Sequence, residues 1–286
     1  MTIFKLLRVH QYVKNFFILF PLFFAAKFQE VELLQSVGLA FLCFSLGASS
    51  IYILNDYLDR EADRLHPTKC KRPIASGKIS PAMALLIAIL CVTSAVSGMY
   101  FIDLNAFYAL LGYLVLNLFY SVKLKHIPIV DISCIAIGFV IRLLVGANAG
   151  QVPLSHWILI MTFLLALFLG LAKRRDDVLL YERSQTKARK AIEGYNLEFL
   201  GSTMMVMSSV TIVSYLLYCV SPEIRSKPGR ENLYVTTFFV VVGIMRYMQL
   251  TFVFEASGSP TRLLLKDRFL QVVIFLWLAT FGWIIY

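Results

Sequence analysis

Long apolar runs alternate with short polar stretches along this chain. Nine runs are long enough to cross a membrane as helices, because about 20 apolar residues span the hydrocarbon core of a bilayer. We expect Pro21 to bend the first run, and Ser80-Pro81 to start the third with Ser as N-cap and Pro in the first turn. The predicted spans are 16–34, 36–54, 82–101, 104–121, 129–149, 154–172, 200–220, 233–254 and 269–286.

Composition agrees with this pattern. Hydrophobic residues make up 59% of the 286 residues and charged residues only 15%, with a mean hydropathy of +0.74. Such a chain is too apolar for a soluble domain, so we predict an all-α polytopic membrane protein folded as a single domain over residues 1–286. The five cysteines are scattered and odd in number, which favours free thiols over a disulfide framework. The sequence leaves a homo-oligomer open.

We attribute the net charge of +10 to membrane topology rather than to a nucleic-acid partner, because the basic residues cluster in short loops between apolar runs. With the N-terminus in the cytoplasm and the C-terminus outside, 21 of the 27 Lys and Arg residues fall on the cytoplasmic side. The positive-inside rule therefore favours this orientation. The two richest polar loops, 55–80 and 173–198, then share the cytoplasmic face.

The first polar loop carries the strongest chemical signal. Asp56, Asp59 and Asp63 are spaced so that they share one face of a helix, where three carboxylates repel each other unless a cation lies between them. Oxygen ligands suit a hard divalent cation such as Mg²⁺. Asn55 and Asp56 close an apolar helix, where polar groups are costly unless they are used. Basic side chains follow that suit phosphate oxygens, namely Lys69, Lys71 and Arg72. An ordinary charged loop is the alternative, and the combined pattern favours a diphosphate site.

Other polar residues lie at the ends of spans or inside them, where charge is costly unless it is used. The simpler interpretation is an interfacial anchor, or, for Asp131 and Arg142, a structural Asp–Arg link to neighbouring residues. For Arg183 to Lys190 we favour the anchor, for Lys125 snorkelling to the interface, and for the small residues around Gly146 close helix packing. The candidates for substrate contact are Lys14, Tyr120, Lys123, Asp131, Arg142, Lys173, Arg174, Asp177 and Arg246.

The chain resembles the UbiA superfamily of intramembrane prenyltransferases, and within it the branch that transfers phosphoribose to decaprenyl phosphate. The resemblance spans nearly the whole chain and rests on short motifs. These are Gln11-Tyr12-Val13-Lys14-Asn15, the pattern of Asn55-Asp56, Asp59 and Asp63, the run from His66-Pro67-Thr68-Lys69 to Gly77, Tyr120-Ser121 with Leu124-Lys125, Lys173-Arg174 with Asp177, Arg246-Tyr247, and Lys266-Asp267-Arg268.

The resemblance implies a UbiA-like bundle of nine transmembrane helices in a bacterial inner membrane, with cytoplasmic polar loops capping a central cavity. It also implies transfer of 5-phosphoribose from phosphoribosyl diphosphate to a polyprenyl phosphate, an arabinan precursor step in cell-wall synthesis. Asn55, Asp56, Asp59 and Asp63 would then hold Mg²⁺ on the diphosphate. Lys69, Arg72, Lys173 and Arg174 would neutralise phosphate groups, and Lys14 and Lys123 would hold the lipid phosphate.

One departure from the superfamily pattern bears on the substrate. Ordinary members carry a second Asp-rich motif after span six, whereas this chain has Lys173-Arg174-Arg175-Asp176-Asp177. Fewer acids and more bases suit a donor with an additional phosphate.

Two other functions are compatible with parts of the pattern. A prenyltransferase that moves a prenyl group from its diphosphate to an aromatic acceptor would use the same first Asp motif. A transporter would place its polar residues near the middle of the bilayer in broken helices. Here they crowd toward one membrane face, which argues against a transporter.

Overall fold

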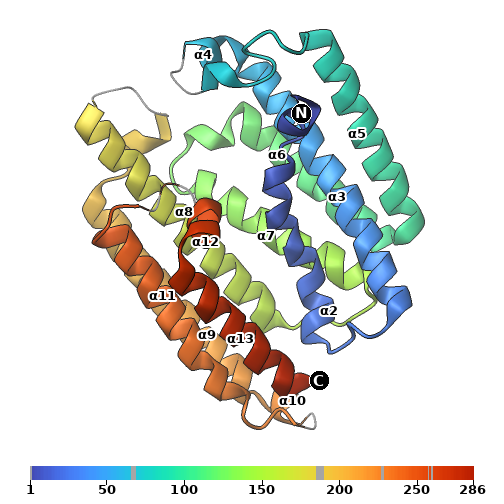
Figure 1. Ribbon diagram of the computed structural model, residues 1–286, viewed down its shortest axis with the longest axis vertical. Helices are drawn as coiled ribbons and strands as arrows, with labels where there is room; N and C mark the ends of the chain where they lie inside the picture. Colours follow the sequence, from blue (N-terminus) through green and yellow to red (C-terminus); the bar gives the residue numbers. More distant parts are fainter. Residues whose placement is uncertain (1, 66–68, 185–189, 227–228, 257, 259) are drawn as a thin grey trace. The chain divides into compact units, whose positions relative to one another are not determined.

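The structure is a computed structural model that describes residues 2–65, 69–184, 190–226, 229–256, 258 and 260–286. Within these ranges the regular elements are all helices (Figure 1). The chain forms two compact units, one of Met1–Val122 with Ile141–Leu154 and the other of Lys123–Val140 with Ser155–Tyr286. The single domain expected from the sequence stays a prediction.

The first unit is organised around its longest helix, α3, which lies beside α5 along most of its length (Figure 1). Its core is a layer of buried apolar side chains that includes Phe44, Leu110 and Val145. Ser80 accepts a hydrogen bond from the Met83 amide at 3.2 Å, so α5 begins with the expected serine cap followed by proline. The elements are α1 (Thr2–Leu6), η1 (Val9–Leu19), α2 (Phe20–Phe24), α3 (Val31–Leu58), α4 (Arg60–Arg64), η2 (Lys69–Lys71), α5 (Pro81–Ile102), α6 (Leu104–Val122) and the later part of α7 (Val130–Ala149).

The first predicted span, 16–34, does not form one α-helix. A 3₁₀ helix, η1, leads into the short helix α2 at Phe20, and a turn separates α2 from α3. Pro21 lies in the first turn of α2, where its missing N–H costs no helical bond. At about 2.0 Å per 3₁₀ residue and 1.5 Å per α residue, η1 and α2 together extend about 30 Å, the thickness of a bilayer core.

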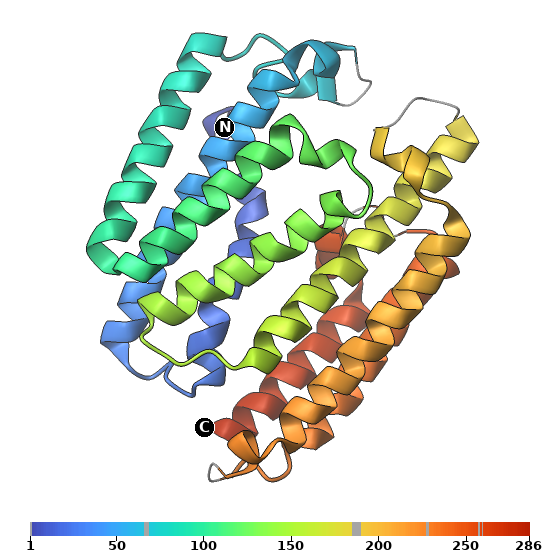
Figure 2. The same ribbon diagram turned by 180° about the vertical axis from the view of Figure 1, so that it is seen from behind.

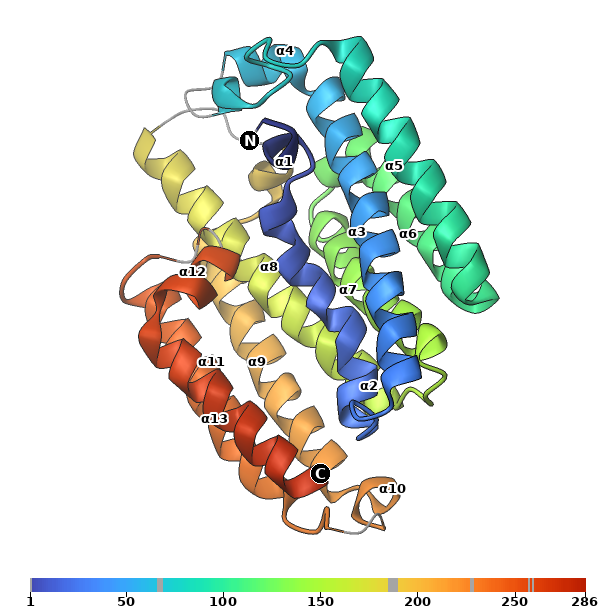
Figure 3. The same ribbon diagram turned by 45° about the vertical axis from the view of Figure 1, so that its right-hand side comes forward.

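Every third residue of η1 faces its neighbours in the first unit, as a 3₁₀ helix with three residues per turn requires. The Tyr12 hydroxyl is 2.9 Å from the Ser49 hydroxyl, and the Asn15 amide donates to Ser45 at 2.9 Å. Ile18 lies against Gly146 of α7, so closely that a Cβ at Gly146 would sit 1.9 Å from the Ile18 carbonyl oxygen. Figure 3 shows this dark blue segment running beside α3.

The second unit is built on α8 and α9, which lie side by side (Figure 2, yellow-green and orange). Phe168, Leu200 and Tyr247 are buried in its core. The elements are η3 (Leu124–His126), the earlier part of α7, α8 (His156–Ser184), η4 (Lys190–Gly194), α9 (Leu197–Val220), α10 (Pro222–Arg225), η5 (Leu233–Thr236), α11 (Thr237–Phe252), α12 (Pro260–Lys266) and α13 (Arg268–Ile285).

Eight helical stretches in the described part of the chain are long and apolar enough to cross a membrane, and they coincide with the second to ninth predicted spans. The fold class is therefore confirmed, while the count of nine helices is not. The predicted loop 173–198 is also corrected, because α8 continues as far as Ser184. This stretch has no Gly or Pro, and Arg174 pairs with Asp177 three residues on, so the helix continues past the apolar run.

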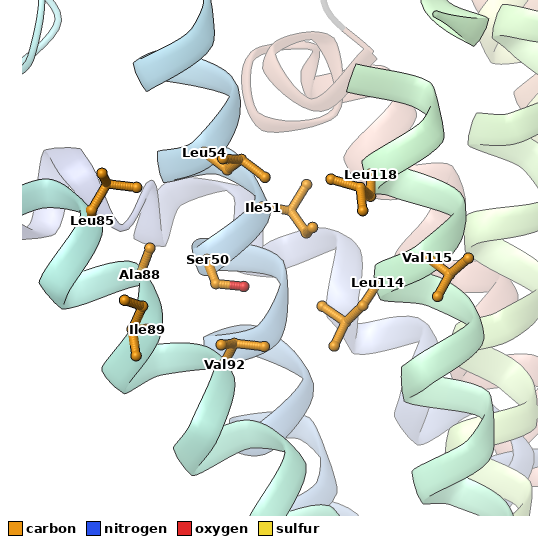
Figure 4. Close-up of a pocket in the computed structure, with 10 residues that line it drawn as sticks. All are labelled: Ser50, Ile51, Leu54, Leu85, Ala88, Ile89, Val92, Leu114, Val115 and Leu118. Atoms are coloured by element: carbon orange, nitrogen blue, oxygen red, sulfur yellow. The ribbon is translucent and has the colours of Figure 1, made fainter. Parts of the chain in front are cut away.

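An apolar groove of about 320 Å³ lies between α3, α5 and α6 of the first unit, with side chains from all three helices around it (Figure 4). Ser50 is its polar residue, and the hydroxyl donates to the Gly47 carbonyl at 2.7 Å. Ile51 in this groove precedes Asp56 by five residues, which places the two nearly opposite each other around α3. The groove therefore lies on a different face of α3 from Asp56.

Candidate active site

Asp56 and Asp63 are brought together at the end of α3. The Asp59 amide donates to the Asn55 carbonyl at 3.0 Å and the Asp63 amide to the Asp59 carbonyl at 2.8 Å, so the helical path continues from α3 into α4. Both carboxylates are almost fully buried. Arg72 Nη1 donates to Asp56 Oδ1 at 3.0 Å and to Asp63 Oδ2 at 2.6 Å. One guanidinium nitrogen therefore lies between two buried carboxylates.

Arg8 is the second cation on Asp56. Its Nη2 forms an ion pair with the same oxygen, Asp56 Oδ1, and its guanidinium lies 5.2 Å from the centre of the Tyr52 ring. The Arg8 backbone is left-handed (φ 51°, ψ 46°), an uncommon conformation for a residue other than Gly. The chain turns at this residue from α1 into η1.

These residues line a polar pocket of about 340 Å³ in the first unit, formed by Lys5, Arg8, His10, Asp56, Lys71, Arg72 and Pro73. Sequence reasoning found Asp56, Lys71 and Arg72. It treated Lys5 and Arg8 as topology signals and His10 as interfacial, because Arg8, which contacts Asp56, lies 48 residues away from it in the chain. The basic residues at the start of the chain were the only sequence signal that could have pointed to this part of the pocket.

The donor set fits Mg²⁺ bound together with a phosphate ligand. Arg72 Nη1 occupies the position between Asp56 and Asp63 where a cation would touch both carboxylates, and Asp59 and Asn55 lie half-buried in the same turns. Among the described residues no group of three His, Cys, Asp or Glu side chains forms a ready-made metal cage. Mg²⁺ is commonly held by one or two carboxylates plus substrate phosphates, so two adjacent carboxylates suffice.

A second charged cluster surrounds Asp131 in the second unit. Asp131 is fully buried and accepts a hydrogen bond from Arg174 Nε at 2.6 Å, while Arg174 Nη1 donates to Asp177 at 2.5 Å. Three sequence-predicted residues are thus brought together. A guanidinium between two carboxylates repeats the arrangement found at Arg72.

Tyr195 completes this cluster and was missed in the sequence. Its hydroxyl donates to Asp131 at 2.8 Å and accepts the Ile129 amide at 2.6 Å. Burial raises the pKa of Tyr195, so the hydroxyl stays protonated and remains a donor. No spacing pattern connects Tyr195 with Asp131, which is 64 residues earlier.

Arg142 is buried within α7 and belongs to the first unit. Its Nε donates to Asn15 at 2.9 Å, its Nη2 to the Tyr113 hydroxyl at 3.3 Å, and its guanidinium lies 5.0 Å from the ring centres of Phe44 and Tyr113. These contacts tie η1, α3 and α6 to α7. Arg142 thereby holds the segment that carries Arg8.

Lys123 and Lys125 differ from expectation. Lys123 lies beyond the end of α6 and is exposed, whereas Lys125 is buried. The helix ends at Val122, so Lys123 does not continue the face that carries Tyr120. A role for Lys123 at the lipid phosphate stays a prediction.

The remaining predicted residues are placed as follows. Arg246 Nη2 donates to Asp267 at 2.7 Å, and this guanidinium holds the pKa of Asp267 below its usual range. Asp267 also caps α13 by accepting the Leu270 amide at 2.8 Å. His66, Pro67 and Thr68 of the first motif lie outside the described residues. Lys14, Lys69, Tyr120 and Lys173 are half-buried.

Comparisons with known proteins agree on one family. The model of the UbiA prenyltransferase family matches residues 15–220. The decaprenyl-phosphate phosphoribosyltransferase of Mycolicibacterium smegmatis is 32% identical over 99% of this chain and 92% of its own length. The protein of the same name from Corynebacterium glutamicum is 33% identical over 96% of this chain and 83% of its own.

A solved structure supports the fold. The UbiA homolog from Archaeoglobus fulgidus bound to GPP and Mg²⁺ superimposes with a TM-score of 0.75 over 100% of this chain and 99% of its own, at 20% sequence identity.

Proposed function

This chain belongs to the UbiA prenyltransferase family of multi-pass membrane transferases, and from that premise we propose that it transfers 5-phosphoribose from phosphoribosyl diphosphate to a polyprenyl phosphate. The likeness to decaprenyl-phosphate phosphoribosyltransferases over nearly the full chain carries the proposal. The lining of the pocket beside Asp56 supports it, with four Lys or Arg side chains to one carboxylate. A donor with several phosphate groups suits that charge.

In this reaction an oxygen of the lipid phosphate attacks C1 of the ribose. The bond from C1 to the diphosphate oxygen breaks, and its electron pair leaves with the diphosphate. The attacking phosphate is already ionised, so the site needs no strong general base. The rate therefore depends on positioning and on stabilising the charge that develops on the leaving group.

The residues divide these tasks between them. Asp56, Asp59, Asp63 and Asn55 would hold Mg²⁺, which when bound neutralises the leaving diphosphate. Lys69, Arg72, Lys173 and Arg174 would neutralise the phosphate groups of the donor. Asp177 orients Arg174 through their ion pair. Lys14 and Lys123 are proposed for the lipid phosphate. We place the reaction at the cytoplasmic face of a bacterial inner membrane.

The test is an incubation of purified protein with labelled phosphoribosyl diphosphate, a polyprenyl phosphate and Mg²⁺. We expect label in the lipid phase and its loss when a chelator is added. A protein that leaves this donor untouched but consumes a prenyl diphosphate with an aromatic acceptor would instead be an ordinary prenyltransferase.

Asp56→Asn should lower the rate of label transfer by about a hundredfold or more, because it removes a carboxylate ligand of the Mg²⁺ that would neutralise the leaving group. Glu61→Gln is the matched control, since Glu61 is an exposed carboxylate in the adjoining helix α4 that pairs with Arg64. Size-exclusion profiles of both variants check that they are folded. Full activity in Asp56→Asn would contradict the assignment.

A further inference from the structure

We infer that Arg8 competes with the divalent cation for Asp56, so that the protein binds the cation and the diphosphate together and the cation alone only weakly. The inference rests on the proposed function only in requiring a diphosphate as leaving group. It extends that function to the order in which the ligands can bind.

The charges at the pocket carry the inference. Asp56 and Asp63 contribute two negative charges, and Arg8 and Arg72, which contact them directly, contribute two positive charges. The carboxylates are therefore neutralised without any metal. Lys5 and Lys71 line the same pocket and make its surroundings positive. A bare divalent cation that enters meets repulsion from four basic side chains.

The geometry makes the competition direct. Arg8 Nη2 and Arg72 Nη1 both contact Oδ1 of Asp56, the kind of oxygen that a hard cation would take as ligand. Arg72 also bridges to Asp63. A cation that takes Oδ1 of Asp56 as its ligand competes with both guanidinium groups, and a guanidinium left beside the cation is strongly unfavourable in a partly buried pocket.

A diphosphate removes this conflict. Its oxygens accept hydrogen bonds from guanidinium groups in the same bidentate manner as a carboxylate does. Arg8 is 21% exposed and lines the pocket, so its guanidinium is accessible to a phosphate that enters. The diphosphate then binds Arg8 while the cation binds Asp56. Each ligand thereby favours the other, and the coupling is reciprocal.

The binding tests use purified full-length protein with neither ribose donor nor lipid phosphate. Mn²⁺ binding without diphosphate is followed by electron paramagnetic resonance, and binding of labelled inorganic diphosphate is measured with Mg²⁺ or with chelator. For the unaltered protein we expect Mg²⁺ to strengthen diphosphate binding by about tenfold or more. Equal diphosphate binding with and without Mg²⁺ would overturn the inference.

The variant Arg8→Gln is the decisive test, because the inference predicts the direction in which its Mn²⁺ affinity changes. The variant should bind Mn²⁺ alone about tenfold more tightly than the unaltered protein, while its diphosphate binding weakens. If Arg8 had a purely structural role, its replacement would not tighten Mn²⁺ binding. Gln is chosen because it is unbranched like Arg, so the left-handed backbone at this residue is equally costly in both. Mn²⁺ affinity that is unchanged or lower in this variant would overturn the inference.

Three further variants keep the result interpretable. Arg64→Gln removes the same charge from α4, where Arg64 pairs with exposed Glu61, and should leave Mn²⁺ binding unchanged. Adding Asp56→Asn to Arg8→Gln should abolish the gained Mn²⁺ binding, which locates the ion. If Arg8→Gln fails to fold, Arg8→Lys should give a smaller gain in the same direction, because an ammonium lacks the guanidinium fork. Failure of phosphoribosyl transfer would leave these binding results intact.

Discussion

At the scale of single residues, hydrogen bonds hold strained backbone beside buried charge. Ile129 has φ 67°, an outlier for a β-branched residue, and its amide donates to the Tyr195 hydroxyl. The same hydroxyl donates to Asp131, the buried partner of Arg174. The loop before α7 and the buried ion pair of Asp131 with Arg174 therefore both depend on one phenol.

Tyr195→Phe should lower the free energy of unfolding by about 1–3 kcal/mol, because it leaves the Ile129 amide and one oxygen of the buried Asp131 without this partner. Thermal unfolding in detergent measures the change. Tyr181→Phe is the control, since Tyr181 is an exposed tyrosine on α8. Equal stability of the two variants would show that Tyr195 does not support this loop.

The residues of the candidate site could be predicted in part from their local spacing in the sequence. Asp56, Asp63 and Arg72 lie within 17 positions of one another, and the structure brings these three side chains into contact. Arg174 and Asp177 are likewise one helical turn apart. Arg8 and Tyr195 could not be found in this way, because their partners are 48 and 64 residues distant and only folding brings them together.

At the scale of elements, the apolar runs located the helices but not their type. Hydropathy counts composition, and it gives the same value for a 3₁₀ and an α conformation. It therefore predicted one span at 16–34 where the chain forms η1, α2 and the start of α3. The small residues near Gly146 did indicate close packing, and the contact of Gly146 with Ile18 confirms it.

Gly146→Ala should destabilise the protein by about 1–3 kcal/mol, because the new methyl group overlaps the Ile18 carbonyl and must push η1 away from α7. Gly38→Ala in α3 and Gly112→Ala in α6 are matched controls, since nothing lies within 4 Å of a Cβ at either position. These controls should be neutral or gain up to about 1 kcal/mol of helix propensity. Unfolding midpoints of the three variants measure the difference, and a neutral Gly146→Ala would contradict the close contact.

At the scale of the whole molecule, topology follows from the number of crossings and the distribution of charge. Eight helices in the described residues meet the length and hydropathy of a span, and the segment 9–24 is long enough to add one more. Nine crossings would put the two termini on opposite sides. The positive-inside rule then predicts that the N-terminus and the Asp56 pocket lie in the cytoplasm.

Cys70 allows this orientation to be measured. It lies half-exposed in η2, whereas Cys91, Cys134 and Cys219 are buried. A membrane-impermeant maleimide should label Cys70 in inverted vesicles and leave it unlabelled in right-side-out vesicles. Asn232→Cys in a Cys70→Ser background should give the opposite result, because Asn232 is exposed in the loop before η5. Labelling of Cys70 from outside would reverse the topology.

The matched repeats of η1 and α3 constrain the number of residues between Arg8 and Asn15. Three 3₁₀ residues rise about 6 Å, as do four α residues, so Tyr12 meets Ser49 while Asn15 meets Ser45. One inserted residue between Arg8 and Asn15 would rotate Arg8 by about 120° and move it about 2 Å along the axis, away from Asp56. Spacing within this segment is therefore constrained more strictly than the identity of its outward-facing residues. Insertions and deletions, rather than point substitutions, are the sharper probe of how the N-terminus serves the pocket.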